Sequence, residues 1–333
     1  MTLPIADTTF VEATWILIVK SIVIFAVIFA IVPMLTVLER KLLGRFQARY
    51  GPNRVGPMGL LQPLADILKL AGKQFFRPDA AVPFLYALGP ALVIFSGITT
   101  IAILPFGDVE DGVGLYGIDV PIGVLYFFAF GSIAFYGLLL GGWASGSKYS
   151  FLGAMRATAQ LISYEISMGL ALLGAIMMAG SLSLVSIVEA QGEIWYVVPQ
   201  FFGFLVFIVA GFAETNRAPF DLPEADAELV QGFQTEYGGT RFASFLLAEY
   251  LEMFVVSGIA VSFFLGGWMG PGPAWMDPIW MIAKILALIM VFIWVRATLP
   301  RLRYDQLMSL GWKVLLPLAT LNVLVTAVLV VIA

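Results

Sequence analysis

The chain has 333 residues, of which 60 % are apolar and 12 % are charged, and its formal net charge is −4. This composition is typical of a polytopic membrane protein, and the negative net charge excludes a basic surface that binds nucleic acid. The sequence contains no cysteine and no histidine, so it lacks the usual ligands of haem, zinc, copper and iron–sulfur clusters, and electron transfer would need metal centres in a neighbouring chain.

The apolar runs predict membrane-spanning helices. Lipid offers no hydrogen bonds to the backbone, so a spanning segment must be a helix or part of a closed barrel, and runs of about twenty apolar residues are typical of helices. The sequence therefore predicts an all-α polytopic membrane protein that forms one membrane domain over residues 1–333. Its eight transmembrane helices are expected at about 13–38, 82–104, 121–141, 156–180, 195–213, 241–267, 279–299 and 313–332.

The loop after the first predicted span contains a short amphipathic segment. Residues 59–73 carry apolar side chains on one helical face and polar ones on the other, with Pro63 in the first turn. Such a helix either lies along the membrane surface as an anchor or closes a cavity. Before it, Arg49 and Arg54 lie in a segment whose glycines and prolines favour turns over helix.

The loop charges predict the orientation in the membrane. Lysine and arginine gather in the loops that follow the odd-numbered spans, whereas the loops at 105–120, 181–194 and 268–278 contain acidic residues and no base. By the positive-inside rule, the basic loops face the cytoplasm and both termini lie on the opposite side. Lys20 and Lys284 lie near the outer ends of spans, where we expect their ammonium groups to extend to the membrane interface.

Residues 214–237 form an unusually acidic connection between two apolar segments, with Arg217 as its only base. Asp221 and Glu224 have the spacing of a capping box, which predicts a helix start. Glu224 and Glu228 then share one helical face, where like charges repel and where one carboxyl is expected to hold a proton. The acidic residues of this connection are Glu214, Asp221, Glu224, Asp226, Glu228 and Glu236.

Three further carboxyls lie inside predicted spans, namely Glu165, Glu249 and Glu252. A lone carboxylate at mid-bilayer is costly, by roughly 2.5 kcal/mol or more on insertion scales, so such residues pair, line a wet cavity or relay protons. One interpretation is a carboxyl path for protons, which the surplus of acids over bases favours. The other is a set of buried ion pairs that only locks the helix packing. Counter-charges could come from Arg296, Arg301 and Arg303.

Three long segments, 37–70, 213–239 and 296–318, carry a family resemblance. With GPNRVGP in the first and PFDLPEA in the second, they resemble the quinone-chamber membrane subunit of proton-pumping NADH:quinone oxidoreductase, respiratory complex I. The resemblance implies eight transmembrane helices in a bacterial inner membrane, with both termini periplasmic. It implies that quinone is the substrate, and that FMN and the iron–sulfur clusters lie in partner subunits. The implied partners are the peripheral-arm quinone-site subunits and the neighbouring membrane-arm subunits.

The resemblance also assigns roles to residues. Residues implied in the quinone chamber and its loops are Glu39, Arg40, Arg49, Arg54, Asp66, Glu214, Arg217, Phe220, Asp221, Arg296, Arg301 and Arg303. Residues of the expected proton path are Glu165, Glu224, Glu228, Glu236, Glu249 and Glu252. Glu252 departs from the family pattern, because relatives usually have an uncharged residue there. Arg49 and Arg301 are expected to order the loops and the interface with the peripheral arm.

Three alternatives stay open at this point. The chain could be the membrane subunit of a related energy-conserving hydrogenase. It could be an ion transporter that works alone, although its polar residues concentrate at the cytoplasmic ends of the spans rather than at mid-membrane. It could also be a purely structural anchor for the peripheral arm, in which case acid-to-amide changes would leave turnover intact.

Overall fold

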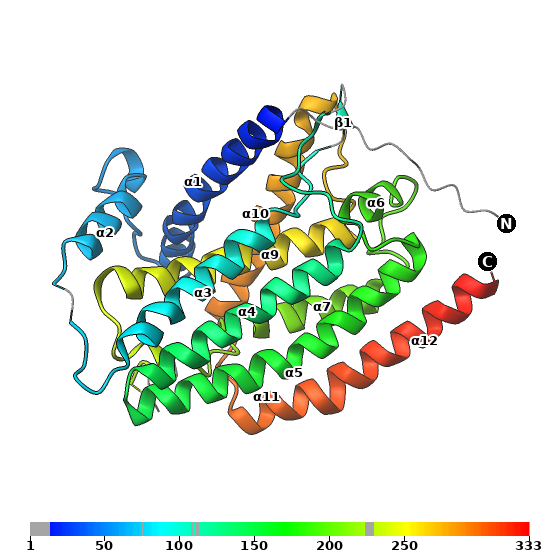
Figure 1. The fold of residues 1–333 in the computed structure, drawn as a ribbon. Coiled ribbons are helices and arrows are strands. Elements are labelled where there is room, and N and C mark those ends of the chain that lie inside the picture. The colour runs from blue at the N-terminus through cyan, green and yellow to red at the C-terminus, as the bar shows by residue number, and fades with distance from the viewer. Residues whose placement is uncertain (1–13, 75, 108, 111–112, 224–229, 333) are drawn as a thin grey trace.

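A bundle of long helices forms the body of the protein (Figure 1). The structure is a computed structural model that describes residues 14–74, 76–107, 109–110, 113–223 and 230–332. Within these residues, seven helices are long and apolar enough to cross a membrane. They are α1 (Thr14–Phe46), α3 (Pro83–Ile101), α4 (Gly123–Ala144), α5 (Lys148–Ala179), α9 (Gly239–Phe264), α10 (Asp277–Thr298) and the continuous helix Tyr304–Ile332.

The expected all-helical membrane fold is confirmed, with one difference in the count. The predicted span at 195–213 is the shorter apolar helix α7 (Phe201–Glu214), of 14 residues. The chain approaches α7 through a loop in which Gln191 Oε1 accepts hydrogen bonds from the backbone nitrogens of Tyr196 and Gly266. A hydropathy window counts the apolar residues of this loop as part of the span, although they are not helical.

Shorter elements connect the long helices. The amphipathic segment forms α2 (Gln62–Ala71), with Pro63 in its first turn as predicted. A small antiparallel pair, β1 (Val109–Glu110) and β2 (Val113–Gly114), follows α3. The remaining short elements are η1 (Pro57–Gly59), α6 (Leu184–Glu189), η2 (Gly232–Gln234), η3 (Ala274–Met276), α11 (Tyr304–Leu310), η4 (Gly311–Leu315, a π-helical turn) and α12 (Leu316–Ile332).

Several helices extend beyond the predicted spans at the end where the charges lie. α1 continues past residue 38 to Phe46, and α5 begins at Lys148 rather than at residue 156. Hydropathy ends a span where charged residues begin, but leucine, lysine and arginine are good helix formers and the backbone continues as helix. Glu39 and Arg40 are therefore held on a rigid helix rather than in a loop.

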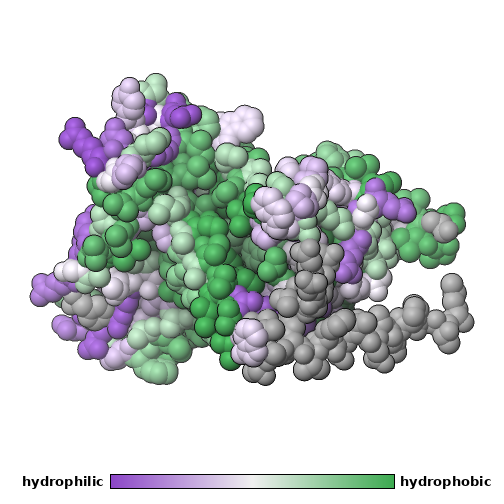
Figure 2. Space-filling view, turned by 90° about the horizontal axis from the view of Figure 1, so that it is seen from above, coloured by the Kyte–Doolittle hydropathy of each residue, from purple (hydrophilic) through white to green (hydrophobic). Residues whose placement is uncertain are grey.

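The two ends of the bundle differ in character. In Figure 1 the start of α1, the strand β1, α6 and the end of α12 lie at one end, and α2 lies at the other. In Figure 2 hydrophilic side chains gather at the α2 end, and hydrophobic side chains cover much of the middle. This is the surface pattern of a membrane protein with one strongly polar end.

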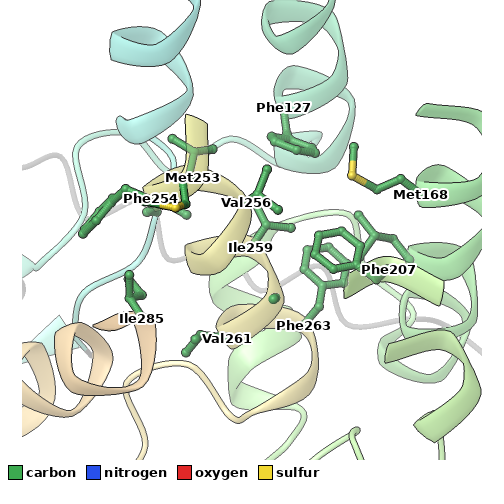
Figure 3. Packing of buried hydrophobic residues seen from close by; sticks show 14 of the residues in the cluster. Phe127, Met168, Phe207, Met253, Phe254, Val256, Ile259, Val261, Phe263 and Ile285 are labelled. Atoms are coloured by element: carbon green, nitrogen blue, oxygen red, sulfur yellow. The ribbon is translucent and has the colours of Figure 1, made fainter. Parts of the chain in front are cut away.

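α9 is the central helix of the core. In the most apolar 18-residue stretch of α9, 72 % of the residues are buried. In the corresponding stretch of the helix Tyr304–Ile332, 17 % are buried. Figure 3 shows the α9 side chains Phe254, Ile259 and Phe263 among residues of the neighbouring helices, including Phe207 of α7 and Ile285 of α10. A helix at the centre of a bundle is expected to be largely apolar, because other helices surround it. The polar residues of α9 can therefore contact several neighbouring elements.

Lys20 and Lys284 both donate hydrogen bonds to backbone carbonyl oxygens of connecting segments, and their extension to the membrane interface stays a prediction. Lys284 Nζ donates hydrogen bonds to the backbone oxygens of Leu265, Gly267 and Met269, at 2.8, 3.0 and 2.6 Å. Lys20 is 8 % exposed, and its Nζ donates to the backbone oxygen of Gly114 at 3.2 Å. Connecting segments therefore supply carbonyl acceptors for both ammonium groups.

Candidate functional site

Two cavities lie side by side near the polar end of the bundle. The larger has a volume of about 690 Å³ and lies between α1, α2 and the segment that leads into α9. The smaller has a volume of about 280 Å³ and reaches the loop after α7 and the end of α10. Arg40, Leu246 and Tyr250 line both cavities, so they form a shared wall.

The larger cavity has mainly apolar walls. α1 contributes Phe29 and Val32, α2 contributes Ile67 and Leu70, and α9 contributes Phe242 among others. α2 therefore walls a cavity, as one of the two interpretations of this helix predicted. Other apolar side chains of α2 are more than half exposed, which also leaves a face for the membrane surface.

A polar pair joins two walls of this cavity. Arg40 Nη1 of α1 lies 2.8 Å from Asp66 Oδ2 of α2, and Gln62 Nε2 donates to Asp66 Oδ1 at 2.9 Å. The Arg40 side chain is 48 % exposed, so the pair contributes at most about 1 kcal/mol to stability. Its main effect is to hold a charged group at the wall of a mainly apolar cavity.

The smaller cavity contains a buried charge cluster centred on Glu39, which is 3 % exposed. The Glu39 carboxylate accepts hydrogen bonds from Arg217 Nη1 at 3.2 Å, from Arg296 Nη1, and from the Tyr250 hydroxyl at 2.6 Å. A buried charge is tolerated only when it is paired and hydrogen-bonded. The cluster thereby connects α1, the loop after α7, α9 and α10.

Arg217 has a second carboxylate within reach. Its Nη2 lies 3.6 Å from Glu249 Oε2, and its guanidinium carbon lies 4.3 Å from the centre of the Tyr250 ring. Burial is the largest single effect and lowers the pKa of the Arg217 guanidinium, but Glu39, Tyr250 and Glu249 together outweigh it, so the net pKa is raised. Arg217 is therefore a permanent cation placed between two carboxylates.

The loop after α7 is held in place by Gln160 of α5. The Gln160 side-chain nitrogen donates to the backbone oxygens of Ala213 and Phe220, at 2.7 and 2.8 Å, and lies 3.3 Å from Asn216 Oδ1. Asn216 has a positive φ of 50°, a conformation that asparagine tolerates and that reverses the chain after the helix. One polar side chain thus fixes the loop that carries Arg217.

A separate group of carboxyls lies deeper, between α5, α7 and α9. Glu165 accepts a hydrogen bond from Ser132 Oγ at 2.7 Å. Glu165 and Glu252 are both close enough to act electrostatically on Glu214. Among the described residues, the buried atoms Glu214 Oε2 and Glu252 Oε1 have no hydrogen-bond partner. Groups in this situation can exchange protons with water or with one another when the surroundings change.

The structure brings many of the predicted site residues together. Glu39, Arg40, Arg217, Asp221, Glu249 and Arg296 line the smaller cavity, and Arg40 and Asp66 line the larger one. Glu165, Glu214 and Glu252 form the deeper group. Glu224 and Glu228, with the helix that the capping box predicts, fall on residues 224–229, which lie outside the described residues.

Other predicted residues lie outside the linings of these two cavities. Arg49 and Arg54 are exposed, and Arg303 pairs with Asp305 at 3.1 Å on the surface. Phe220 is 4 % exposed, and its ring packs on the Tyr164 ring of α5 with the centroids 5.7 Å apart. This contact anchors the loop after α7 to α5. Glu236 offers its backbone oxygen to the Tyr86 hydroxyl at 2.6 Å. Arg301 is half-buried near the end of α10.

Four residues of the site were not predicted from the sequence, namely Tyr250, Gln160, Gln234 and Ser132. Gln234 Nε2 donates to Glu249 Oε1 at 3.1 Å, and the other three make the contacts described above. Gln160 and Ser132 are polar residues inside predicted spans, and such residues mark functional or packing sites. That signal could have found them, as could the position of Tyr250 next to Glu249.

Comparison with known proteins identifies the family. A family model described as NADH dehydrogenase matches residues 19–327. The chain belongs to this family. It is 52 % identical over 315 residues to an NADH-quinone oxidoreductase subunit of Geobacter metallireducens, and the match covers 92 % of this chain and 94 % of the relative. It is 48 % identical over 319 residues to an NADH-quinone oxidoreductase subunit of Syntrophobacter fumaroxidans, covering 93 % of this chain and 95 % of the relative.

The family membership confirms the resemblance seen in the sequence. A further relative, an NADH-quinone oxidoreductase subunit of Geobacter sulfurreducens, is 52 % identical over 312 residues, with 92 % of this chain and 94 % of the relative covered. These three relatives all carry the NADH-quinone oxidoreductase name. They favour the main hypothesis over the hydrogenase and lone-transporter alternatives.

Proposed function

We propose that this member of the NADH dehydrogenase family is the membrane subunit of a proton-translocating NADH:quinone oxidoreductase, in which it forms the quinone-binding chamber. The observation that carries the proposal is the apolar cavity of about 690 Å³ directly beside the buried cluster on Glu39. A quinone combines an apolar tail with a polar ring. An apolar cavity with a few fixed polar groups in its wall suits such a ligand.

Coupling to proton movement follows from the charges around the smaller cavity. When a quinone is reduced it gains negative charge or takes up protons, and this change acts strongly on charges in a low-dielectric interior. Arg217 lies between Glu39 and Glu249, and Glu249 lies on the same helix as Glu252. A shift of Arg217 would alter the field at Glu249, and from there at Glu252, Glu214 and Glu165.

The electrons are expected to arrive from partner subunits. The sequence offers no cysteine or histidine to hold an iron–sulfur cluster, which agrees with the implication of the resemblance that FMN and the clusters lie in peripheral-arm partners. The exposed bases Arg49 and Arg54 lie at the polar end and suit a contact with that arm. The chain would then be a multi-pass protein of a bacterial inner membrane, with its basic loops in the cytoplasm and its termini on the periplasmic side.

The coupling role is tested with Glu214→Gln in the assembled complex. We expect NADH oxidation to continue with short-chain quinone while proton pumping, measured as dye quenching in inverted vesicles, falls severalfold. Asp305→Asn, on the exposed surface, serves as the matched control and should change neither quantity. Undiminished pumping in Glu214→Gln would remove this residue from the path, and undiminished pumping together with unchanged turnover would support the structural-anchor alternative.

A further inference from the structure

Tyr250 lies where the two cavities meet, and it is 7 % exposed. Its hydroxyl donates to Glu39 Oε2 at 2.6 Å, and its ring lies 4.3 Å from the guanidinium carbon of Arg217. One side chain thus lines the larger cavity and contacts both Glu39 and Arg217, which form an ion pair in the smaller cavity. Leu246 and Arg40 also line both cavities, but no hydrogen bond to Glu39 is found for either within the described residues.

The chemistry of tyrosine suits a link of this kind. A hydroxyl that donates to a carboxylate makes a short and strong hydrogen bond, and the face of the ring attracts a guanidinium. Both interactions depend on the position of the same ring. Any displacement of the ring therefore changes the surroundings of Glu39 and Arg217 together.

Arg217 can respond because it has two carboxylates within reach. Its present contacts are Glu39 at 3.2 Å and Glu249 at 3.6 Å, and the second is too long for a hydrogen bond. Arg296 also donates to Glu39, so Glu39 keeps a partner when Arg217 moves away from it. An exchange of Arg217 between the two carboxylates needs only a small movement and leaves no buried carboxylate unpaired.

We propose that Tyr250 is a positioning residue that transmits the occupancy of the larger cavity to the charge cluster in the smaller one. A quinone ring that packs against Tyr250 displaces its hydroxyl from Glu39, and Arg217 shifts from Glu39 towards Glu249. No covalent bond changes in this step, because one set of hydrogen bonds replaces another. The inference deepens the proposed function and rests on it, since it requires quinone in the larger cavity.

The test compares Tyr250→Phe with Tyr136→Phe in the assembled complex. Tyr250→Phe keeps the ring and removes only the hydroxyl, and Tyr136 is a 53 % exposed residue of α4 outside both cavities. Three quantities are measured: labelling by a photoreactive short-chain quinone, the infrared difference spectrum on binding of that quinone, and protons pumped per NADH oxidised. Loss of a hydrogen bond to a charged group shifts an equilibrium roughly tenfold or more, here the exchange of Arg217 between Glu39 and Glu249.

For Tyr250→Phe we expect unchanged labelling of α2 and α9, loss of a tyrosine C–O band from the difference spectrum, and a severalfold lower ratio of protons to NADH. Tyr136→Phe should match the unmodified protein in all three. A merely structural role would lower turnover and pumping together and leave their ratio intact. That result, or an unchanged tyrosine band, would overturn the proposal.

The outcomes of this experiment distinguish a failure of this inference from a failure of the proposed function. If the photoreactive quinone labels neither α2 nor α9, the proposed function fails, and the role of Tyr250 fails with it. If labelling persists while the ratio and the band are unaffected by Tyr250→Phe, only the role of Tyr250 fails. Should Tyr250→Phe not assemble, the unmodified complex with isotope-labelled tyrosine still decides, because absence of any tyrosine band on quinone binding overturns the proposal.

Discussion

Glu39 illustrates how a single buried carboxylate can join distant parts of a membrane protein. Three donors converge on it, from Arg217, Arg296 and Tyr250. Each arrives from a different helix or loop. In an apolar interior such a cluster stabilises the fold only when it is complete, because a missing partner leaves a buried charge without compensation.

Replacing Glu39 should therefore be costly. We expect Glu39→Gln to destabilise the assembled complex by about 3–5 kcal/mol, because two arginines lose their carboxylate. Asp305→Asn is the matched control: it removes the exposed partner of Arg303 and should cost no more than about 1 kcal/mol. The temperature of half-inactivation of solubilised complex measures the difference. Equal temperatures for the two variants would contradict the importance of the cluster.

Gln160 acts at the same scale, on the backbone of the loop that carries Arg217. Gln160→Leu keeps the volume but leaves the carbonyl oxygens of Ala213 and Phe220 without this donor, at about 1–3 kcal/mol for a buried group. We expect the loop to open and limited proteolysis within it to become faster. Thr158→Val is the control, since the Thr158 hydroxyl donates to the backbone oxygen of Ala154 in its own helix. Equal cleavage rates would rule out the proposed anchoring.

At the scale of elements, α3 and α4 approach each other through glycines. A Cβ at Gly137 would lie 2.5 Å from Val93 Cγ2 and 2.8 Å from the backbone oxygen of Gly89, so a side chain there requires the helices to separate. Helices in lipid gain stability mainly from such close packing. By contrast, a Cβ at Gly131 of the same helix meets no described atom within 4 Å.

Gly137→Ala and Gly131→Ala form a matched pair. Overpacking of a close contact costs about 1–3 kcal/mol, so Gly137→Ala should lower the thermal stability and the yield of assembled complex. Gly131→Ala should be neutral or slightly stabilising, because alanine favours helix over glycine. Quantified native gels of solubilised membranes measure both effects. Loss of assembly in Gly131→Ala alone would show that the contact is not where the structure has it.

At the scale of the whole molecule, basic and acidic loops alternate along the chain, and the two kinds of loop lie at opposite ends of the bundle (Figure 1). Lys148 lies at the turn between α4 and α5, and Gly192 lies in the acidic loop after α6. Both residues are exposed. Because the sequence has no cysteine, single cysteines can be introduced and labelled without background.

The orientation predicts opposite labelling of two such variants. A membrane-impermeant maleimide added to intact cells should label Gly192→Cys, and should label Lys148→Cys only after permeabilisation. Labelling is read as a mass shift of the protein. The reverse pattern would place the termini in the cytoplasm and invert the proposed topology.

The sequence determined much about this protein without help from the structure. Apolar runs are local signals, and they predicted the long helices and α2 with Pro63 in its first turn. The family was predicted separately, from the resemblance of segments 37–70, 213–239 and 296–318. Intramembrane carboxyls such as Glu165 and Glu249 could also be predicted as site residues, because a carboxyl within an apolar span is energetically costly. Helix ends were less accurate at α1 and α5, since a helix continues where hydropathy stops.

Which residues meet depends on the packing of the helices and could not be predicted from local sequence. Glu39 is 178 residues from Arg217, 211 from Tyr250 and 257 from Arg296 in the sequence, and no periodicity relates positions so far apart. Lys284 likewise donates to three carbonyl oxygens of residues 265–269, contacts that its position in the sequence does not indicate. Local patterns determine which residues are helical and which are costly to bury, whereas the packing of α1, α9 and α10 determines which charges share one cavity.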